Sequence, residues 1–114
     1  EILNKLVEAA VQNARNPERM REDIQQVFDL AAGVRTTDQL VDEHLRNTMP
    51  GGVPDQRDRI RARNCLQQRH QHARDALIKA ANTIAQGTLD PAEVVWTTHF
   101  VTRYLTRRRQ NPQP

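Results

Sequence analysis

Arginine side chains gather in the second half of this chain and could bind a polyanion. Lysine occurs only at positions 5 and 79, so arginine carries nearly all of the positive charge, and its planar guanidinium suits phosphate and carboxylate partners. A phosphate backbone bound in this way would lose affinity steeply as salt rises. The alternative is a solvated arginine face, since a GC-rich genome also favours arginine over lysine. The candidate polyanion-binding residues are Arg57, Arg61, Arg63, Arg74, Arg103, Arg107, Arg108 and Arg109.

Cys65, His70 and His72 are the side chains that could ligate a metal or supply a nucleophile. On a helix Cys65 and His72 share a face, whereas His70 and His72 diverge, and no Cys-x-x-Cys or His-x-x-x-His pair is present. A thiol nucleophile at Cys65 would need His44 or His99 and an oxyanion hole, and the local sequence indicates no such hole. We therefore expect no metal, no cofactor and no enzyme. The histidines at 70, 72 and 99 are predicted to be exposed, and Cys65 to be a small, partly buried residue.

Length and composition are those of one small domain with an uneven charge. The chain has 114 residues, of which 37% are hydrophobic, enough for a single core. Residues 1–50 carry a net charge of −3 and residues 51–114 a net charge of +6. Such asymmetry suggests either a basic surface for an acidic partner or complementary faces for self-association.

Several functional classes lack their usual signals. No serine is present, which excludes serine nucleophiles, and Gly51-Gly52 lacks the strand and the Lys-Ser/Thr of a phosphate-binding loop. No apolar stretch approaches the ~18 residues of a membrane span, so we expect no membrane and no small-molecule substrate. The single cysteine favours a reducing, intracellular compartment. Because the chain begins mid-pattern without Met, we expect a fragment that lacks any targeting signal.

The elements that would position these side chains are helices. Apolar residues recur at helical spacing, and capping signals divide the chain: Asn16-Pro17, Thr36 with Gln39, and Asp55 at starts, and Gly33 at an end. We predict an all-α fold, a compact bundle of about five helices near 2–14, 17–32, 37–48, 55–86 and 91–108. These form a single helical domain over 1–109, with acidic helices in 1–49, a Pro/Gly loop at 50–54, basic helices in 55–109 and a disordered tail at 110–114.

Residues 88–105 are predicted to form the helix around which the others pack. Trp96, Phe100 and Tyr104 recur every four residues and would share one arc of a helix. The same stretch alternates well enough to be a strand, but Asp90-Pro91-Ala92-Glu93 is a strong helix start, with Glu93 closing a capping box. The predicted buried residues are Trp96, Phe100, Val101 and Leu105, together with Phe28, Ile24 and Leu6.

The long helix at 55–86 contains one polar turn. Residues 67–72 include no large apolar side chain, whereas the residues before and after them form an apolar seam. We predict that this turn is kinked or stands clear of the bundle.

The function favoured by these patterns is a non-enzymatic interaction or assembly domain of a larger protein. It would bind a protein partner, or itself as a homo-oligomer, through helix surfaces. The alternative is a nucleic-acid-binding module that uses the arginine-rich half, and a third class is a small hydrolase around Cys65.

Overall fold

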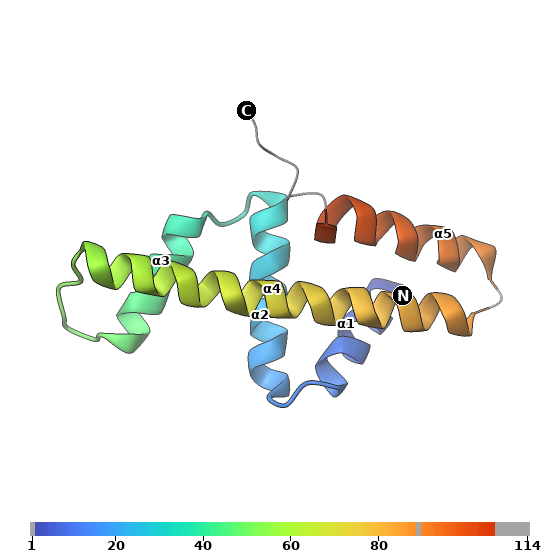
Figure 1. The fold of residues 1–114 in the computed structure, drawn as a ribbon, viewed down its shortest axis with the longest axis horizontal. Helices are drawn as coiled ribbons and strands as arrows, with labels where there is room; N and C mark the ends of the chain where they lie inside the picture. Colours follow the sequence, from blue (N-terminus) through green and yellow to red (C-terminus); the bar gives the residue numbers. More distant parts are fainter. Residues whose placement is uncertain (1, 89, 107–114) are drawn as a thin grey trace.

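The fold is all-α. The computed structural model describes residues 2–88 and 90–106, and no strand occurs among them. The strand alternative for the stretch after Asp90 is therefore wrong. The helices are α1 (Ile2–Gln12), α2 (Pro17–Ala32), α3 (Thr37–Thr48), α4 (Gln56–Gly87) and α5 (Pro91–Phe100), and α5 continues into a π-helical segment, η1 (Val101–Thr106) (Figure 1).

The predicted capping residues lie where these helices begin and end. The Asn16 side chain accepts a hydrogen bond from the Arg19 amide, and Thr36 and Gln39 form both bonds of a capping box. Gly33 ends α2 with φ of 76°, in the left-handed region that glycine adopts without strain. Asp55 caps α4 in the same way as Thr36 caps α3. Local sequence signals thus account for these boundaries.

The start of α5 differs in one respect from the prediction. Asp90 caps the helix, but it accepts a hydrogen bond from the Ala92 amide at 3.0 Å, and no capping box with Glu93 forms. The Glu93 carboxylate instead lies 3.5 Å from Lys5 of α1. The Asp90 amide, which Glu93 would have bonded, donates instead to Oγ1 of Thr88 at 3.1 Å. The predicted end of this helix at 108 and the tail at 110–114 lie outside the described residues.

Helix α4, and not the stretch at 88–105, is the element around which the others pack. It runs the length of the molecule, which measures 54 × 36 × 19 Å. Helix α3 packs obliquely on its first half, α2 crosses it near the middle, α1 packs obliquely on its second half, and α5 runs alongside that second half (Figure 1). With 32 residues, α4 is long enough to contact all four other helices, whereas the ten residues of α5 span only one end.

Two separate apolar clusters result from this arrangement. The larger cluster joins α1, α2, the second half of α4, α5 and η1, which we call the main lobe. Residues 37–66, which comprise α3, the connecting loop and the first turns of α4, form a projection that we call the arm. The buried residues of the arm are Leu40, Val41, Leu45, Ala62 and Leu66. Five residues make a thin core, so two helices of the arm remain largely open to solvent.

Phe100 is the best-covered ring of the main lobe. It is 7% exposed, stacks on Trp96 at 5.2 Å between centroids and meets the edge of Phe28 at 6.0 Å. The predicted burial of Leu6, Ile24 and Leu105 is confirmed. Trp96, Phe28 and Val101 are only partly buried, because they lie at the margin of the cluster. The side chain of Tyr104 lies outside the described part of the chain.

The polar turn at 67–72 is neither kinked nor clear of the bundle. Helix α4 is continuous from Gln56 to Gly87, and α2 crosses it at this turn, where Arg69 and His70 contact Asp23 and Gln26 of α2. The prediction failed because it treated polar side chains as solvent-facing. Here they are matched by polar side chains on the facing helix.

Candidate functional site

A polar contact is buried where α2 crosses α4. One carboxylate oxygen of Asp23 accepts hydrogen bonds from Nη2 and Nε of Arg69 at 2.6 and 3.0 Å, and the Asp23 side chain is 5% exposed. Next to it, Nε2 of His70 lies 2.7 Å from Oε1 of Gln26. His70 is therefore buried, contrary to the sequence prediction. Each polar group has a partner, so the contact joins the helices without a group left available for chemistry.

A signal for this contact was present in the sequence. Asp23 and Gln26 interrupt the apolar face of α2 that Met20, Ile24 and Val27 form, just as residues 67–72 interrupt the seam of α4. Two interrupted faces that must pack in one small domain can be matched to each other, since buried polar groups need partners.

The histidine in this contact is held neutral. Burial lowers the pKa of His70 from 6.5 to about 4; the negative charge of Asp23 opposes this shift, whereas Arg74, Arg69 and Arg35 add to it. Because the folded protein disfavours the protonated ring, His70 contributes its full stability above pH 6.5. That contribution is lost as the pH falls from 6.5 towards 4.

We therefore expect the free energy of unfolding to fall by about 1–2 kcal/mol between about pH 7.5 and pH 5, a range above most carboxylate titrations. Urea unfolding at each pH would measure it. Burial, with the positive charges of Arg69 and Arg19, also lowers the pKa of His44, so His44 contributes to the same pH dependence. His70→Gln should reduce the slope of the unfolding free energy against pH. His72→Gln should leave that slope unchanged, because His72 is exposed. Equal slopes for the wild type and His70→Gln would contradict the assignment.

The remaining candidate ligands and nucleophiles are dispersed. Cys65 is exposed and not partly buried as predicted. His72 and His99 are exposed, as predicted. Within residues 2–88 and 90–106, no three side chains of His, Cys, Asp or Glu lie close enough to hold a metal ion together.

Several arginines of the first half of α4 are paired with acidic residues of the preceding helices. Arg59 lies 2.7 Å from Asp42 of α3, and Arg63 lies 3.3 Å from Asp38. Arg69, farther along α4, pairs with Asp23 of α2. The basic and acidic halves of the sequence are thus folded against each other. Part of the charge asymmetry along the chain is thereby neutralised by ion pairs between the two halves.

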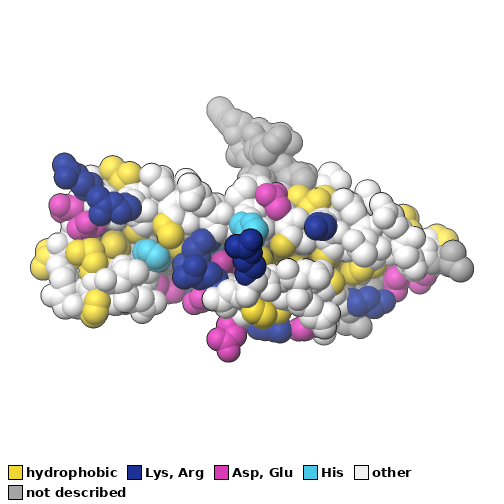
Figure 2. Space-filling model, turned by 60° about the horizontal axis from the view of Figure 1, so that its bottom comes forward, with side chains coloured by type: hydrophobic (Ala, Val, Ile, Leu, Met, Phe, Trp, Pro, Cys, Tyr) yellow, Lys and Arg dark blue, Asp and Glu magenta, His cyan; other side chains and the backbone are white. Residues whose placement is uncertain are grey.

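The candidate polyanion-binding residues within the described part of the chain are spread over α4 and η1. Arg57 and Arg61 lie in the first turns of α4, and Arg61 is 3.9 Å from Asp58. Arg74 is partly buried and donates a hydrogen bond to Gln71, while Arg103 is exposed on η1, in the main lobe. Figure 2 shows one face, on which basic side chains are interleaved with acidic and hydrophobic ones. The three arginines at 107–109 lie outside the described residues.

The net charge of the protein equals the charge of those three arginines. Residues 1–106 contain 14 basic and 14 acidic residues, so the net charge of +3 corresponds to Arg107, Arg108 and Arg109. The arm is also neutral, with five residues of each sign in 37–66. The helices therefore carry no net positive charge that would attract a polyanion at long range.

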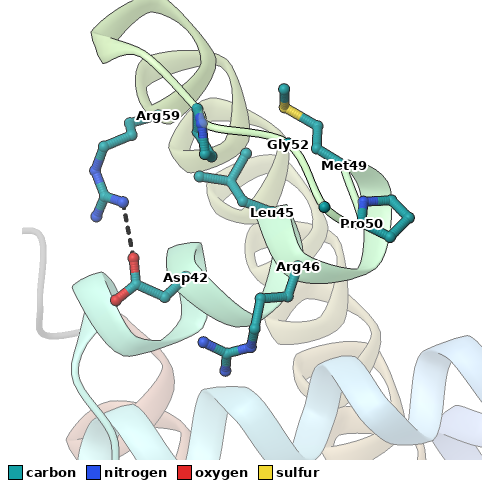
Figure 3. Close-up of a pocket in the computed structure, with 9 residues that line it drawn as sticks. Asp42, Leu45, Arg46, Met49, Pro50, Gly52 and Arg59 are labelled. Atoms are coloured by element: carbon teal, nitrogen blue, oxygen red, sulfur yellow. Dashed lines mark hydrogen bonds and ion pairs between the residues drawn. The ribbon is translucent and has the colours of Figure 1, made fainter.

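The tip of the arm contains a hollow that the sequence did not predict. Its volume is about 470 Å³, and its lining includes Leu45, Arg46 and Met49 of the α3 end, Pro54, and the Asp42–Arg59 ion pair. Figure 3 shows Leu45 between that ion pair and the loop, with Met49 at the opposite end from the pair. The hollow combines an apolar floor with a charged rim.

The loop that borders this hollow is a defined turn. The Gly52 amide donates a hydrogen bond to the Met49 carbonyl at 3.0 Å, and Gly51 has φ of 78°. Proline followed by a glycine with positive φ is typical of a type II turn. The next residue, Val53, is 92% exposed, and Ile60 on the adjoining turn of α4 is 50% exposed. The turn therefore presents an apolar side chain to solvent beside the hollow.

Within residues 2–88 and 90–106, no helix combines the length and the apolar character needed to cross a membrane.

Comparison with known proteins identified no relative. No protein-family model, no curated protein and no solved structure matches the chain.

Proposed function

We propose that this chain is a non-enzymatic assembly domain that binds a protein partner or another copy of itself through helix surfaces. The observation that carries the proposal is the construction of the arm. Its core has five buried residues, and its tip leaves Val53 and Ile60 exposed beside an apolar-floored hollow. Exposed apolar side chains grouped around a concavity are typical of interaction sites.

The distribution of charge supports the same proposal. Carboxylates of α2 and α3 form ion pairs with Arg59, Arg63 and Arg69. A phosphate backbone would have to displace those carboxylates. Intramolecular pairing thereby reduces the number of arginines in α4 that could contact phosphate. A neutral arm can approach another protein surface without net repulsion.

Nucleic-acid binding is the second candidate function, and it rests on Arg107, Arg108 and Arg109. These three residues supply the whole net charge. A short basic segment can attract a polyanion without any folded site, and its affinity would then be low and strongly dependent on salt.

A titration of labelled DNA and RNA separates the two functions. We expect binding no tighter than about 100 µM near physiological salt, because Arg59, Arg63 and Arg69 already pair with carboxylates, and a paired arginine releases fewer counterions on binding phosphate. Arg107→Glu, Arg108→Glu and Arg109→Glu together should abolish even that residual binding, whereas Arg57→Glu with Arg61→Glu is the matched change within α4. Each lost phosphate contact would lower the salt slope by about one.

The opposite result would replace the assembly proposal. Micromolar binding near physiological salt that is lost in the Arg57→Glu, Arg61→Glu variant would mean that α4 binds the phosphate backbone. Micromolar binding lost only in the triple variant would place the nucleic-acid site in the last residues of the chain.

A further inference from the structure

The tip of the arm carries both an exposed apolar side chain and a hollow that could receive one. Val53 is 92% exposed, and the lining of the hollow beside it includes Leu45, Met49 and Pro54 together with Arg46 and the Asp42–Arg59 ion pair. Residues 49–54 contain no charged side chain. The tip is thus uncharged where it protrudes, and its hollow combines apolar and charged side chains.

We propose that two copies of this chain dock tip to tip, with Val53 of each copy seated in the hollow of the other. This inference rests on the proposed assembly function and names its partner. A protrusion and a recess on the same surface are self-complementary, and a two-fold axis satisfies both at once. The result is a closed dimer, because each copy uses its one tip.

The shape of the molecule permits this approach. The tip lies at one end of the long axis, and the main lobe lies at the other end (Figure 1). Two tips can therefore meet without collision between the main lobes. The dimer would be close to twice the 54 Å length of one copy.

Charge at the rim of the hollow is complementary to charge beside Val53. Arg46 lines the hollow, is exposed, and is within 4 Å of no carboxylate among the described residues. Asp55 is exposed and lies two residues after Val53. When Val53 is seated, the second copy's Asp55 would lie near Arg46. The five positive and five negative residues of the arm leave no net repulsion between two copies.

The Met49–Gly52 turn favours insertion of Val53 into the partner's hollow, whereas the small area of the interface limits the affinity of the dimer. The Met49–Gly52 hydrogen bond holds the loop before binding, which reduces the ordering cost of association. A contact confined to two tips falls below the ~1,200 Å² of a standard interface. The dimer is therefore weak, with a Kd of tens to hundreds of micromolar, on the order of a transient complex.

Sedimentation equilibrium from about 10 µM to about 1 mM tests the proposal, since that range brackets the expected Kd. The wild type should pass from monomer to dimer. Val53→Lys should raise the Kd by about tenfold or more, because it would place an ammonium group beside Arg46 and Arg59, which line the hollow. Its fold should be retained, since Val53 is almost fully exposed. Val95→Lys is the matched control: Val95 is 68% exposed on α5, in the main lobe, and its change should leave dimerisation unaltered.

Cross-linking provides a measurement of the docking geometry. In a Cys65→Ala background, a mixture of Val53→Cys and Arg46→Cys chains should form a disulfide between the two variants more readily than either variant forms one with itself. Preferential linkage within each single variant would overturn the seating of Val53 beside Arg46.

The outcomes also separate this inference from the assembly function. A wild-type dimer that is unaffected by Val53→Lys would overturn the tip-to-tip docking and leave an assembly domain with another interface. A chain that stays monomeric at about 1 mM would overturn the docking as well. If that monomer also bound nucleic acid at micromolar concentrations through α4, the proposed function would fail with it.

Discussion

Phe100→Ala should lower the free energy of unfolding by about 3–5 kcal/mol, enough to unfold a domain of ordinary stability. Phe100 is 7% exposed, and its removal would leave a cavity between Trp96, 5.2 Å away by centroids, and Phe28. Two aromatic contacts would be lost along with the buried area.

Two probes measure this effect during urea unfolding. Far-ultraviolet circular dichroism reports all helices, and fluorescence reports Trp96, the single tryptophan. Val95→Ala is the control, because Val95 is 68% exposed and its change should cost no more than about 0.5 kcal/mol. A Phe100→Ala variant with the midpoint of the wild type would show that α5 does not help to hold the main lobe together. A fluorescence transition that precedes the dichroism transition would show that α5 separates first.

Arg69→Met should cost about 3 kcal/mol or more, since it leaves the carboxylate of Asp23 buried without its partner. The Asp23 side chain is 5% exposed and that of Arg69 is 19% exposed. Burial disfavours the charge on Arg69, but the hydrogen bonds and charge of Asp23 outweigh it, so the pKa of Arg69 is raised. Arg69 thus stays charged at every ordinary pH.

A double-mutant cycle separates the interaction energy of Asp23 with Arg69 from the cost of burying each charged side chain. Asp23→Leu with Arg69→Met should recover most of the lost stability, because two apolar side chains of suitable size can replace a buried pair. Arg63→Met is the control on the same helix: its side chain is 51% exposed and pairs with an Asp38 that is 73% exposed, and such pairs contribute about 0–1 kcal/mol. Equal losses of unfolding free energy for Arg69→Met and Arg63→Met would show that the buried Asp23–Arg69 pair stabilises the protein no more than an exposed pair does.

Much of the local structure could be predicted because its causes are local. The caps of α2, α3 and α4 are made by side chains within three residues of the amides that they bind. The start of α5 shows where this approach fails: the Asp90 amide bonds Oγ1 of Thr88 and not Glu93, and Glu93 contacts Lys5, 88 residues away in sequence. Two local acceptors were available for one amide, and the sequence alone did not decide between them.

The candidate site could be predicted far less well than the fold. Counting arginines identified a basic half, but the carboxylates that pair with Arg59 and Arg63 lie 17 and 25 residues away in sequence. No local sequence pattern predicts ion pairs between residues so far apart. The hollow at the tip was missed because it depends on the angle between α3 and α4 and on the turn between them.

The sequence by itself determined that this chain forms five helices, where most of them begin and end, and that a Pro/Gly turn separates two halves of opposite charge. Periodicity and capping act over three to four residues, so these features can be predicted from the local sequence. Only the tertiary structure decided that α4 is the central helix and that His70 is buried against a residue 44 positions away. It also decided that the two charged halves largely neutralise each other. The reason is that buried polar and charged groups are stabilised by whichever partner the packing brings within bonding distance, and that distance is set by the arrangement of whole helices.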